Sequence, residues 1–275
     1  MEPGFYKDLP ADDYHSGEGI SKSDLWAIQR SPAHWKYQKK KETPGMMFGS
    51  AFHAAALEPE IYKAKYVTMP SGLTMRHNAG KDFAANAAAN GQCVITAEDR
   101  NVIAEMIEAL QKHHDAKDLI WPTDGNAEYE LSSYWQDPEY GILCKSRHDV
   151  LNKSIGASVD IKTTVDARPR PFGKIAWDKG YYAQAGFYTY GLLMLTKVRH
   201  DFYFVAIEKE SPYGINVYRA TQEYIDEGLK VIYQAIKIYI ECHKDNRWPC
   251  YPEGLLEIDL PSYVKRKEML NAIIE

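Results

Sequence analysis

The sequence predicts an α/β protein in which a mixed central sheet is flanked by helices. Two observations indicate this class. Apolar residues recur at helical spacing through 96–113, whereas from residue 127 onward short segments alternate apolar and polar residues as strands do. The expected elements then run helix, three strands, helix, strand, which is the order of a mixed sheet covered by helices.

The N-terminal third is predicted to be helical. A helix is expected over 21–38, with Ser21 or Ser23 as its cap, and Ser31-Pro32 interrupts it so that a second helix follows. Small residues around His53 let another element approach closely, so this side chain is expected to lie against the core. Further helices are expected over 48–57, Asn78–Ala89 and 96–113.

Strands dominate the region from 127 to 219. They are expected over 127–135, 142–151, 155–165, 200–208 and Ile215–Arg219, with a turn at 137–141. Two more helices, over 181–195 and 223–242, are expected to cover the sheet, and the tail beyond Trp248-Pro249 is expected to end in a charged helix.

Length and composition are those of an ordinary globular protein. The chain has 275 residues, of which 45% are hydrophobic and 26% charged, so we expect one domain over 1–275 with its core at roughly 45–242. The formal charge of −5 is opposite to that of a basic DNA-coating domain, so any contact with nucleic acid is expected to be local and concave.

The sequence also predicts where the protein works. No apolar run approaches the ~18 residues of a membrane span, and the N-terminus has no signal-peptide pattern. Four widely spaced cysteines without a Cys-x-x-Cys pair favour reduced thiols over a zinc ribbon. We therefore expect a cytoplasmic protein without a membrane partner.

The strongest chemical signal is Asp160-Ile161-Lys162 in the middle of a predicted strand. Side chains alternate along a strand, so Asp160 and Lys162 share one face. Asp149 ends the preceding strand and would lie beside Asp160 if the two strands pair through an Asn152-Lys153 turn. Two acids and a lysine suit metal-dependent phosphodiester hydrolysis, because the acids hold the cation and the ammonium orients water and offsets charge.

Other residues support this set less strongly. Gln184 and Tyr188 are spaced i, i+4 on the next helix and share a face, although ordinary helix packing explains the same spacing. His53 alone is more often a core histidine, Glu130 alone an exposed strand residue, and Asp149 alone a turn acid. No phosphate-cradling loop, nucleophile elbow or zinc-spaced histidine pair competes with this chemistry.

The ordered motifs resemble a known family. Asp149, Asp160-Ile161-Lys162 and Gln184-x-x-x-Tyr188 resemble the PD-(D/E)XK superfamily in its RecB-like branch, which also has an upstream histidine. More closely, the chain resembles the nuclease domain of RecE (exonuclease VIII) and its phage relatives. The blocks that carry this likeness are Gly19 to Leu25, Ser31 to His34, Gly49 to His53, Leu57 to Glu60, Asp160 to Thr164, Tyr182 to Tyr188, and Trp248-Pro249.

The resemblance implies a restriction-endonuclease-like core and a 5′-to-3′ exonuclease on linear double-stranded DNA. It implies Mg²⁺ or Mn²⁺, a ring-shaped homo-oligomer (trimer or tetramer), and a RecT-like single-strand annealing partner that uses the 3′ tails in phage or prophage recombination. The carried-over metal ligands are His53, Asp149, Asp160 and the carbonyl of Ile161. Lys162 would position the water, Gln184 and Tyr188 would support the site or contact DNA, and Glu130 is a further acid that matches less securely.

An exonuclease of this kind also needs a pocket for the 5′-phosphate. Ser21, Ser23, Arg76 and Lys81 are candidates, since hydroxyls and basic side chains suit phosphate, although Ser21 also fits a simple helix cap. The alternatives are a structure-specific or single-strand endonuclease of the same superfamily, and a non-catalytic DNA-binding protein that retains the fold.

Overall fold

The computed structural model describes residues 1–39, 43–251 and 253–260. Within them a seven-stranded mixed sheet forms the centre of the molecule. Its path runs β1 (Gly4–Tyr6), β5 (Ala127–Gln136), β6 (Leu143–Asn152), β7 (Ala157–Thr164), β8 (Asp201–Glu208) and β9 (Ile215–Arg219), and β2 (Ile20–Ser21) pairs with β6 outside this path. The β7–β8 and β2–β6 pairs are parallel and the others antiparallel. The predicted mixed α/β class is confirmed.

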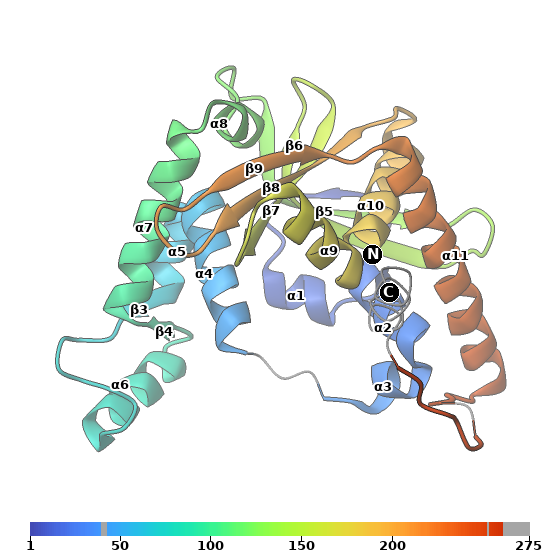
Figure 1. Cartoon of the computed structure of the whole chain (residues 1–275), viewed down its shortest axis with the longest axis horizontal. Helices are drawn as coiled ribbons and strands as arrows, with labels where there is room; N and C mark the ends of the chain where they lie inside the picture. Colours follow the sequence, from blue (N-terminus) through green and yellow to red (C-terminus); the bar gives the residue numbers. More distant parts are fainter. Residues whose placement is uncertain (40–42, 252, 261–275) are drawn as a thin grey trace, which may run out of the picture.

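Helices cover both faces of this sheet (Figure 1). Apolar residues of β6, β7 and β8, among them Val150, Ile161 and Val205, pack against α4 (Pro44–Leu57), α7 (Ala97–Lys112) and α8 (His114–Ile120). Phe202, Phe204 and Ala206 of β8 alternate with those residues and face α9 (Pro169–Asp178), α10 (Tyr181–Thr196) and α11 (Gln222–Asp245). This alternation places the core on both sides of one sheet.

A close crossing of α10 and α11 fixes one of these layers. A Cβ atom added at Gly228 would lie 1.9 Å from the carbonyl oxygen of Tyr182, and one at Gly186 would lie 2.7 Å from that of Ile225. Only glycine allows the two backbones to approach this closely. The crossing holds α10, and with it Gln184, against the sheet.

The remaining elements lie around this core. They are α1 (Ala11–Ser16), α2 (Lys22–Arg30), α3 (Pro32–Tyr37), α5 (Pro59–Lys65), α6 (Asn78–Ala89) and the parallel pair β3 (Tyr66–Thr68) and β4 (Cys93–Ile95). Figure 1 shows α6, β3 and β4 at the lower left, below the lower end of α7. No helix in the described part of the chain is long and apolar enough to cross a membrane.

Most of the long predicted elements are confirmed, with altered ends. The predicted break in 21–38 is real, because Ser31 ends α2 and caps α3 while Pro32 takes the first helical position. The predicted Asn152-Lys153 turn is wrong: Asn152 still belongs to β6, and the turn occupies 153–156. The reason is that the Asn152 amide donates to the carbonyl of Leu119 at 3.0 Å, which holds it at the strand end.

Several short elements were not predicted from the sequence patterns. Strands of two or three residues, such as β1 and β2, are too short to show a period, and α9 contains Pro171 and Gly173. The expected charged helix at the C-terminus falls on residues 261–275, which lie outside the described residues.

Candidate active site

The pairing of β6 with β7 brings the two predicted acids together. Val150 pairs with Val159, so the antiparallel register sets Asp149 opposite Asp160. Asp149 turns one carboxylate oxygen toward the neighbouring strand, where Oδ2 accepts a hydrogen bond from the Ile161 N–H at 2.8 Å. The expected juxtaposition is therefore present, although the turn that produces it differs from the predicted one.

His53 reaches the same point from α4. Its Nε2 lies 2.9 Å from the carbonyl oxygen of Ile161 and donates to it, and its Nδ1 lies 3.7 Å from Asp149 Oδ2. The imidazole is 26% exposed: it lies against the β7 backbone, as expected, and its open side faces a cavity. The small residues Ala51 and Ala56 on the buried side of α4 let this helix approach β7, as their sequence pattern suggested.

Glu130 lies closer to this set than its sequence match indicated. The β5–β6 register, in which Tyr129 pairs with Val150, sets Glu130 opposite Asp149. Its φ of 46° is left-handed, a conformation that is uncommon for a residue other than glycine. An ion pair with Arg147 at 2.6 Å holds its carboxylate beside the cavity.

Three of these side chains offer a set of metal ligands. One ligand atom each from His53, Glu130 and Asp149 lies within 4.8 Å of the others. An imidazole nitrogen with carboxylate oxygens suits Mn²⁺, and the carboxylates suit Mg²⁺. The residues therefore fit a divalent cation. The composition of this set differs from the expected one, because Glu130 is present in it and Asp160 is not.

Asp160 and Lys162 form a buried ion pair next to these ligands. Lys162 Nζ lies 2.5 Å from Asp160 Oδ2, and Gln184 of α10 donates from Nε2 to the other oxygen, Oδ1. The Tyr181 ring lies 4.7 Å from the same Nζ, which places a cation–π contact beside the ion pair. Asp160 is 3% exposed, so this carboxylate keeps Lys162 in place from within the protein.

Tyr188 follows Gln184 by one helical turn, as predicted. Its ring packs on the buried ring of His148 at 5.0 Å between centroids, and burial raises the pKa of its hydroxyl well above the ordinary value. Both Gln184 and Tyr188 line the same cavity. The shared face expected from their spacing is therefore present, with Tyr188 set deeper among aromatic rings.

Burial and charge shift the protonation of the site. Burial, followed by the nearby charge of Asp160, raises the pKa of Asp149 to about 7. Burial alone would lower the pKa of Lys162, but the charges of Asp160 and Asp149 outweigh it and raise that pKa above its ordinary value. The site therefore keeps Lys162 charged and leaves excess negative charge, which a cation would neutralise.

One cavity of about 640 Å³ is lined by His53, Glu130, Asp149, Lys162, Gln184 and Tyr188, while Asp160 lies behind Lys162 in the protein interior. Ser21 and Ser23 also line it, whereas Arg76 and Lys81 are exposed elsewhere, Arg76 in the loop before α6 and Lys81 within α6. Ser21 is at the same time the cap of α2: its Oγ accepts from the N–H of Asp24, as the capping interpretation predicted. The structure thus brings two of the four phosphate candidates to the site.

Three cavity residues were missed by sequence reasoning. Lys22 enters from the first turn of α2, where burial, followed by the charge of Lys162, lowers its pKa to about 7. Arg147 lies two residues before Asp149 on the strand, and this spacing could have identified it as sharing that face. Tyr181 precedes Gln184 by three residues, and the same helical spacing could have found it.

A mixed sheet with this acid, acid and lysine arrangement defines a PDDEXK-like domain. Over residues 21–258 the chain matches the family described as a PDDEXK-like domain of unknown function (DUF3799), and it belongs to that family. The resemblance to the PD-(D/E)XK superfamily is therefore confirmed.

A solved structure shares the fold. A candidate exonuclease from Eubacterium rectale superposes with a TM-score of 0.61 at 14% identity, covering 93% of this chain and 97% of that one. The structure of SSO0001 matches with a TM-score of 0.35 at 11% identity over 82% of this chain and 81% of that one, which is too low to support an argument. No curated protein matches the sequence.

Proposed function

We propose that the protein is a metal-dependent 5′-to-3′ exodeoxyribonuclease that degrades linear double-stranded DNA and leaves 3′ single-stranded tails. One observation carries the hydrolytic part of this proposal: Lys162, which is held by the buried Asp160, lines the same cavity as Asp149 and His53, and these two meet at the Ile161 backbone. The likeness of the motifs to RecE supports the exonuclease part.

The chain's own residues perform distinct tasks in this reaction. Lys162 orients the attacking water and offsets the charge that develops on the phosphate, while Asp160 holds the ammonium in place and Gln184 holds Asp160. The attacking water gives up a proton to solvent as its oxygen bonds to phosphorus, the bond from phosphorus to the 3′-oxygen breaks, and that oxygen leaves with a proton from solvent. The product carries a 5′-phosphate.

The proposed cofactor is Mg²⁺ or Mn²⁺. His53, Glu130 and Asp149 would hold it, with Asp160 and the Ile161 carbonyl beside them. When bound, the ion supplies Lewis-acid polarisation of the scissile phosphate and neutralises charge there. Glu130 is also held by Arg147, so this carboxylate is already oriented before any ion binds.

A 5′-phosphate would contact the N-terminal turn of α2. Ser21 and Ser23 offer hydroxyl groups at the cavity wall, and Lys22 between them adds a basic group. This arrangement supports the 5′-to-3′ polarity that the RecE likeness implies. Arg76 and Lys81 do not line this cavity, so we propose Lys22 in their place.

The assembly proposed for this activity is a ring-shaped homo-oligomer, a trimer or tetramer, that threads duplex DNA. A ring accounts for the net charge of −5, because basic residues can line a channel while the outer surface stays acidic. A RecT-like annealing protein would take over the 3′ tails. Light scattering of the purified protein tests the ring, and a monomer both alone and on DNA would contradict it.

The activity is tested with three DNA substrates in Mg²⁺: linear duplex with labelled 5′-phosphates, the same duplex with 5′-hydroxyl ends, and covalently closed circles. The proposal predicts release of labelled mononucleotides from the first, slower loss of the second, and intact circles. Cleaved circles would identify an endonuclease on the same fold. Binding of all three substrates without cleavage would identify a non-catalytic DNA-binding protein.

A further inference from the structure

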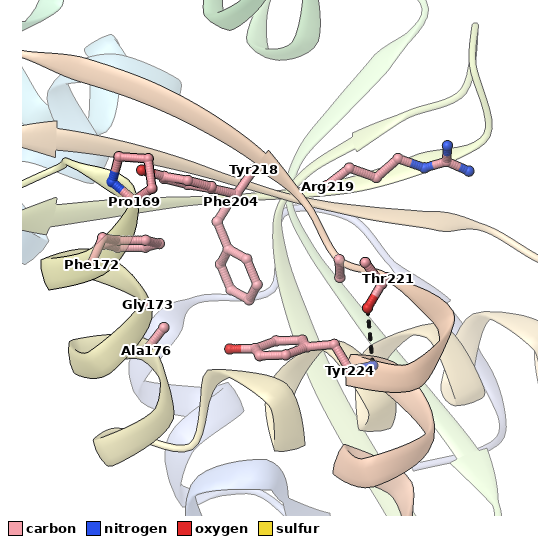
Figure 2. A pocket seen from close by; sticks show the side chains of 10 residues that line it. Pro169, Phe172, Gly173, Ala176, Phe204, Tyr218, Arg219, Thr221 and Tyr224 are labelled. Carbon is pink, nitrogen blue, oxygen red and sulfur yellow. Dashed lines mark hydrogen bonds between the residues drawn. The ribbon is translucent and has the colours of Figure 1, made fainter.

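A second pocket lies beside the catalytic cavity, between α9, β8, β9 and the start of α11 (Figure 2). Its volume is about 180 Å³, which admits a single small ring system. Four aromatic side chains surround it: Phe172, Phe204, Tyr218 and Tyr224. The rings of Phe172 and Tyr218 are already stacked on each other, with centroids 4.9 Å apart and planes inclined by 13°.

The walls between these rings are small and flat. Gly173 and Ala176 of α9 line the pocket without bulk, and a Cβ atom added at Gly173 would meet nothing within 4 Å. Figure 2 shows the Tyr224 ring extending across the pocket toward α9, with its hydroxyl at the far end. The pocket therefore combines ring faces for stacking with a hydroxyl that can bond the edge of a polar ring.

One layer of aromatic side chains separates this pocket from the catalytic lysine. Phe204 is the register partner of Asp160 across the parallel β7–β8 pair. Its ring stacks on that of Tyr181, with centroids 5.6 Å apart. Tyr181 in turn lines the catalytic cavity, and the centre of its ring lies 4.7 Å from Lys162 Nζ. A DNA strand in the cavity would therefore pass close to the pocket.

Basic residues of α9 and β9 lie near the pocket. Arg170 and Lys174 are exposed on α9, and Arg168 at its start pairs with Asp166 at 2.7 Å. Arg219 lines the pocket and pairs with Asp201 at 2.9 Å. The ion pairs offset the charges of Arg168 and Arg219, so Arg170 and Lys174 supply the positive charge that a phosphodiester backbone needs, in a chain that is acidic as a whole.

We propose that this pocket binds one unpaired nucleobase of the DNA strand next to the catalytic site. The base would insert among Phe172, Phe204 and Tyr224, while the phosphates beside it lie along α9. Aromatic stacking of this kind accepts any base, because every base has a π face. The inference rests on the proposed function for its substrate. It adds a subsite for an unstacked base, which positions the DNA strand relative to Lys162.

The test measures DNA binding in EDTA, so that it is independent of hydrolysis. Gly173→Leu fills the pocket, and Gly173→Ala adds only a Cβ to an open position and is the matched control. The DNA is a duplex with a short single-stranded extension, in which each base of the extension is removed in turn to leave an abasic position. Affinities are measured for the wild type and for both variants.

The proposal predicts one position at which loss of the base weakens wild-type and Gly173→Ala binding about tenfold, as for the loss of one base stacked on an aromatic ring. Gly173→Leu should bind intact DNA with that same tenfold loss and be insensitive to the abasic position. The proposal is overturned if no position is sensitive, or if all three proteins show the same profile. If the wild type shows the predicted binding profile but does not cleave DNA in Mg²⁺, the base pocket is supported and the proposed nuclease function is contradicted.

Discussion

Asp149 accepts a hydrogen bond from the main-chain N–H of Ile161 at 2.8 Å, so the carboxylate of one strand is fixed by the backbone of the next. The carbonyl of the same Ile161 contacts His53, and its strand neighbours are Asp160 and Lys162. One peptide segment thus orients the groups of the catalytic cavity from both sides. This geometry is set by sheet pairing, so the site is already formed before substrate binds.

The raised pKa of Asp149 makes the stability of the metal-free protein depend on pH. The folded state holds this proton up to a pKa of about 7 against an ordinary value of 3.8, so the free energy of unfolding falls as pH rises through that window. Asp149→Asn should remove this loss, and the shift sets an upper limit of about 4 kcal/mol on the gain at pH 8. Denaturant unfolding in EDTA at pH 5 and pH 8 measures it.

The Asp149→Asn variant also tests whether the charge of Asp149 is needed for metal binding. Mg²⁺ or Mn²⁺ should stabilise the wild type at pH 8 and stabilise Asp149→Asn much less, because a ligand stabilises the folded state more the more tightly it binds. Equal stability curves for the two proteins in EDTA at both pH values would contradict the raised pKa.

The lowered pKa of Lys22 predicts that DNA binding is accompanied by proton uptake. Its pKa is lowered to about 7 by burial and by Lys162, and a phosphate beside it would raise that pKa again. Oligonucleotide affinity should therefore fall as pH rises from 7 to 9, and binding at pH 8 should take up protons. Calorimetry in two buffers of different ionisation enthalpy measures the uptake, and Lys22→Gln should abolish it. Unchanged uptake in that variant would remove Lys22 from the phosphate site.

Two glycines on the same side of the sheet should respond oppositely to alanine. Gly228→Ala places a Cβ 1.9 Å from the Tyr182 carbonyl and should cost at least about 2 kcal/mol, since the α10–α11 crossing must open. Gly173→Ala meets nothing and should stabilise α9 by about 0.5–1 kcal/mol. Urea unfolding of both variants checks the pair, and similar changes in both would contradict the close crossing.

The sequence predicted those parts of the site that lie within one element or one hairpin. Asp160 and Lys162 share a face because strand side chains alternate, and Gln184 and Tyr188 share one because of helical spacing. Asp149 followed from pairing of adjacent strands. Local periodicity is sufficient for such relationships, so they could be stated before the structure.

The remaining parts depend on long-range packing. Lys22 reaches the cavity because β2 pairs in parallel with β6, a contact between segments more than a hundred residues apart. Glu130 joins the ligand set through a left-handed φ that no propensity predicts for glutamate. The aromatic pocket brings together residues of α9, β8, β9 and α11, and the sequence patterns did not predict α9.

The most direct test of the account is hydrolysis of linear duplex DNA in Mg²⁺ by the wild type and by Asp160→Asn. This substitution keeps the size and an oxygen acceptor for Gln184 while it removes the charge that holds Lys162. The account predicts rapid release of nucleotides by the wild type, and a loss of at least about a hundredfold in rate for the variant with unchanged circular dichroism. Equal rates in the two proteins would contradict it.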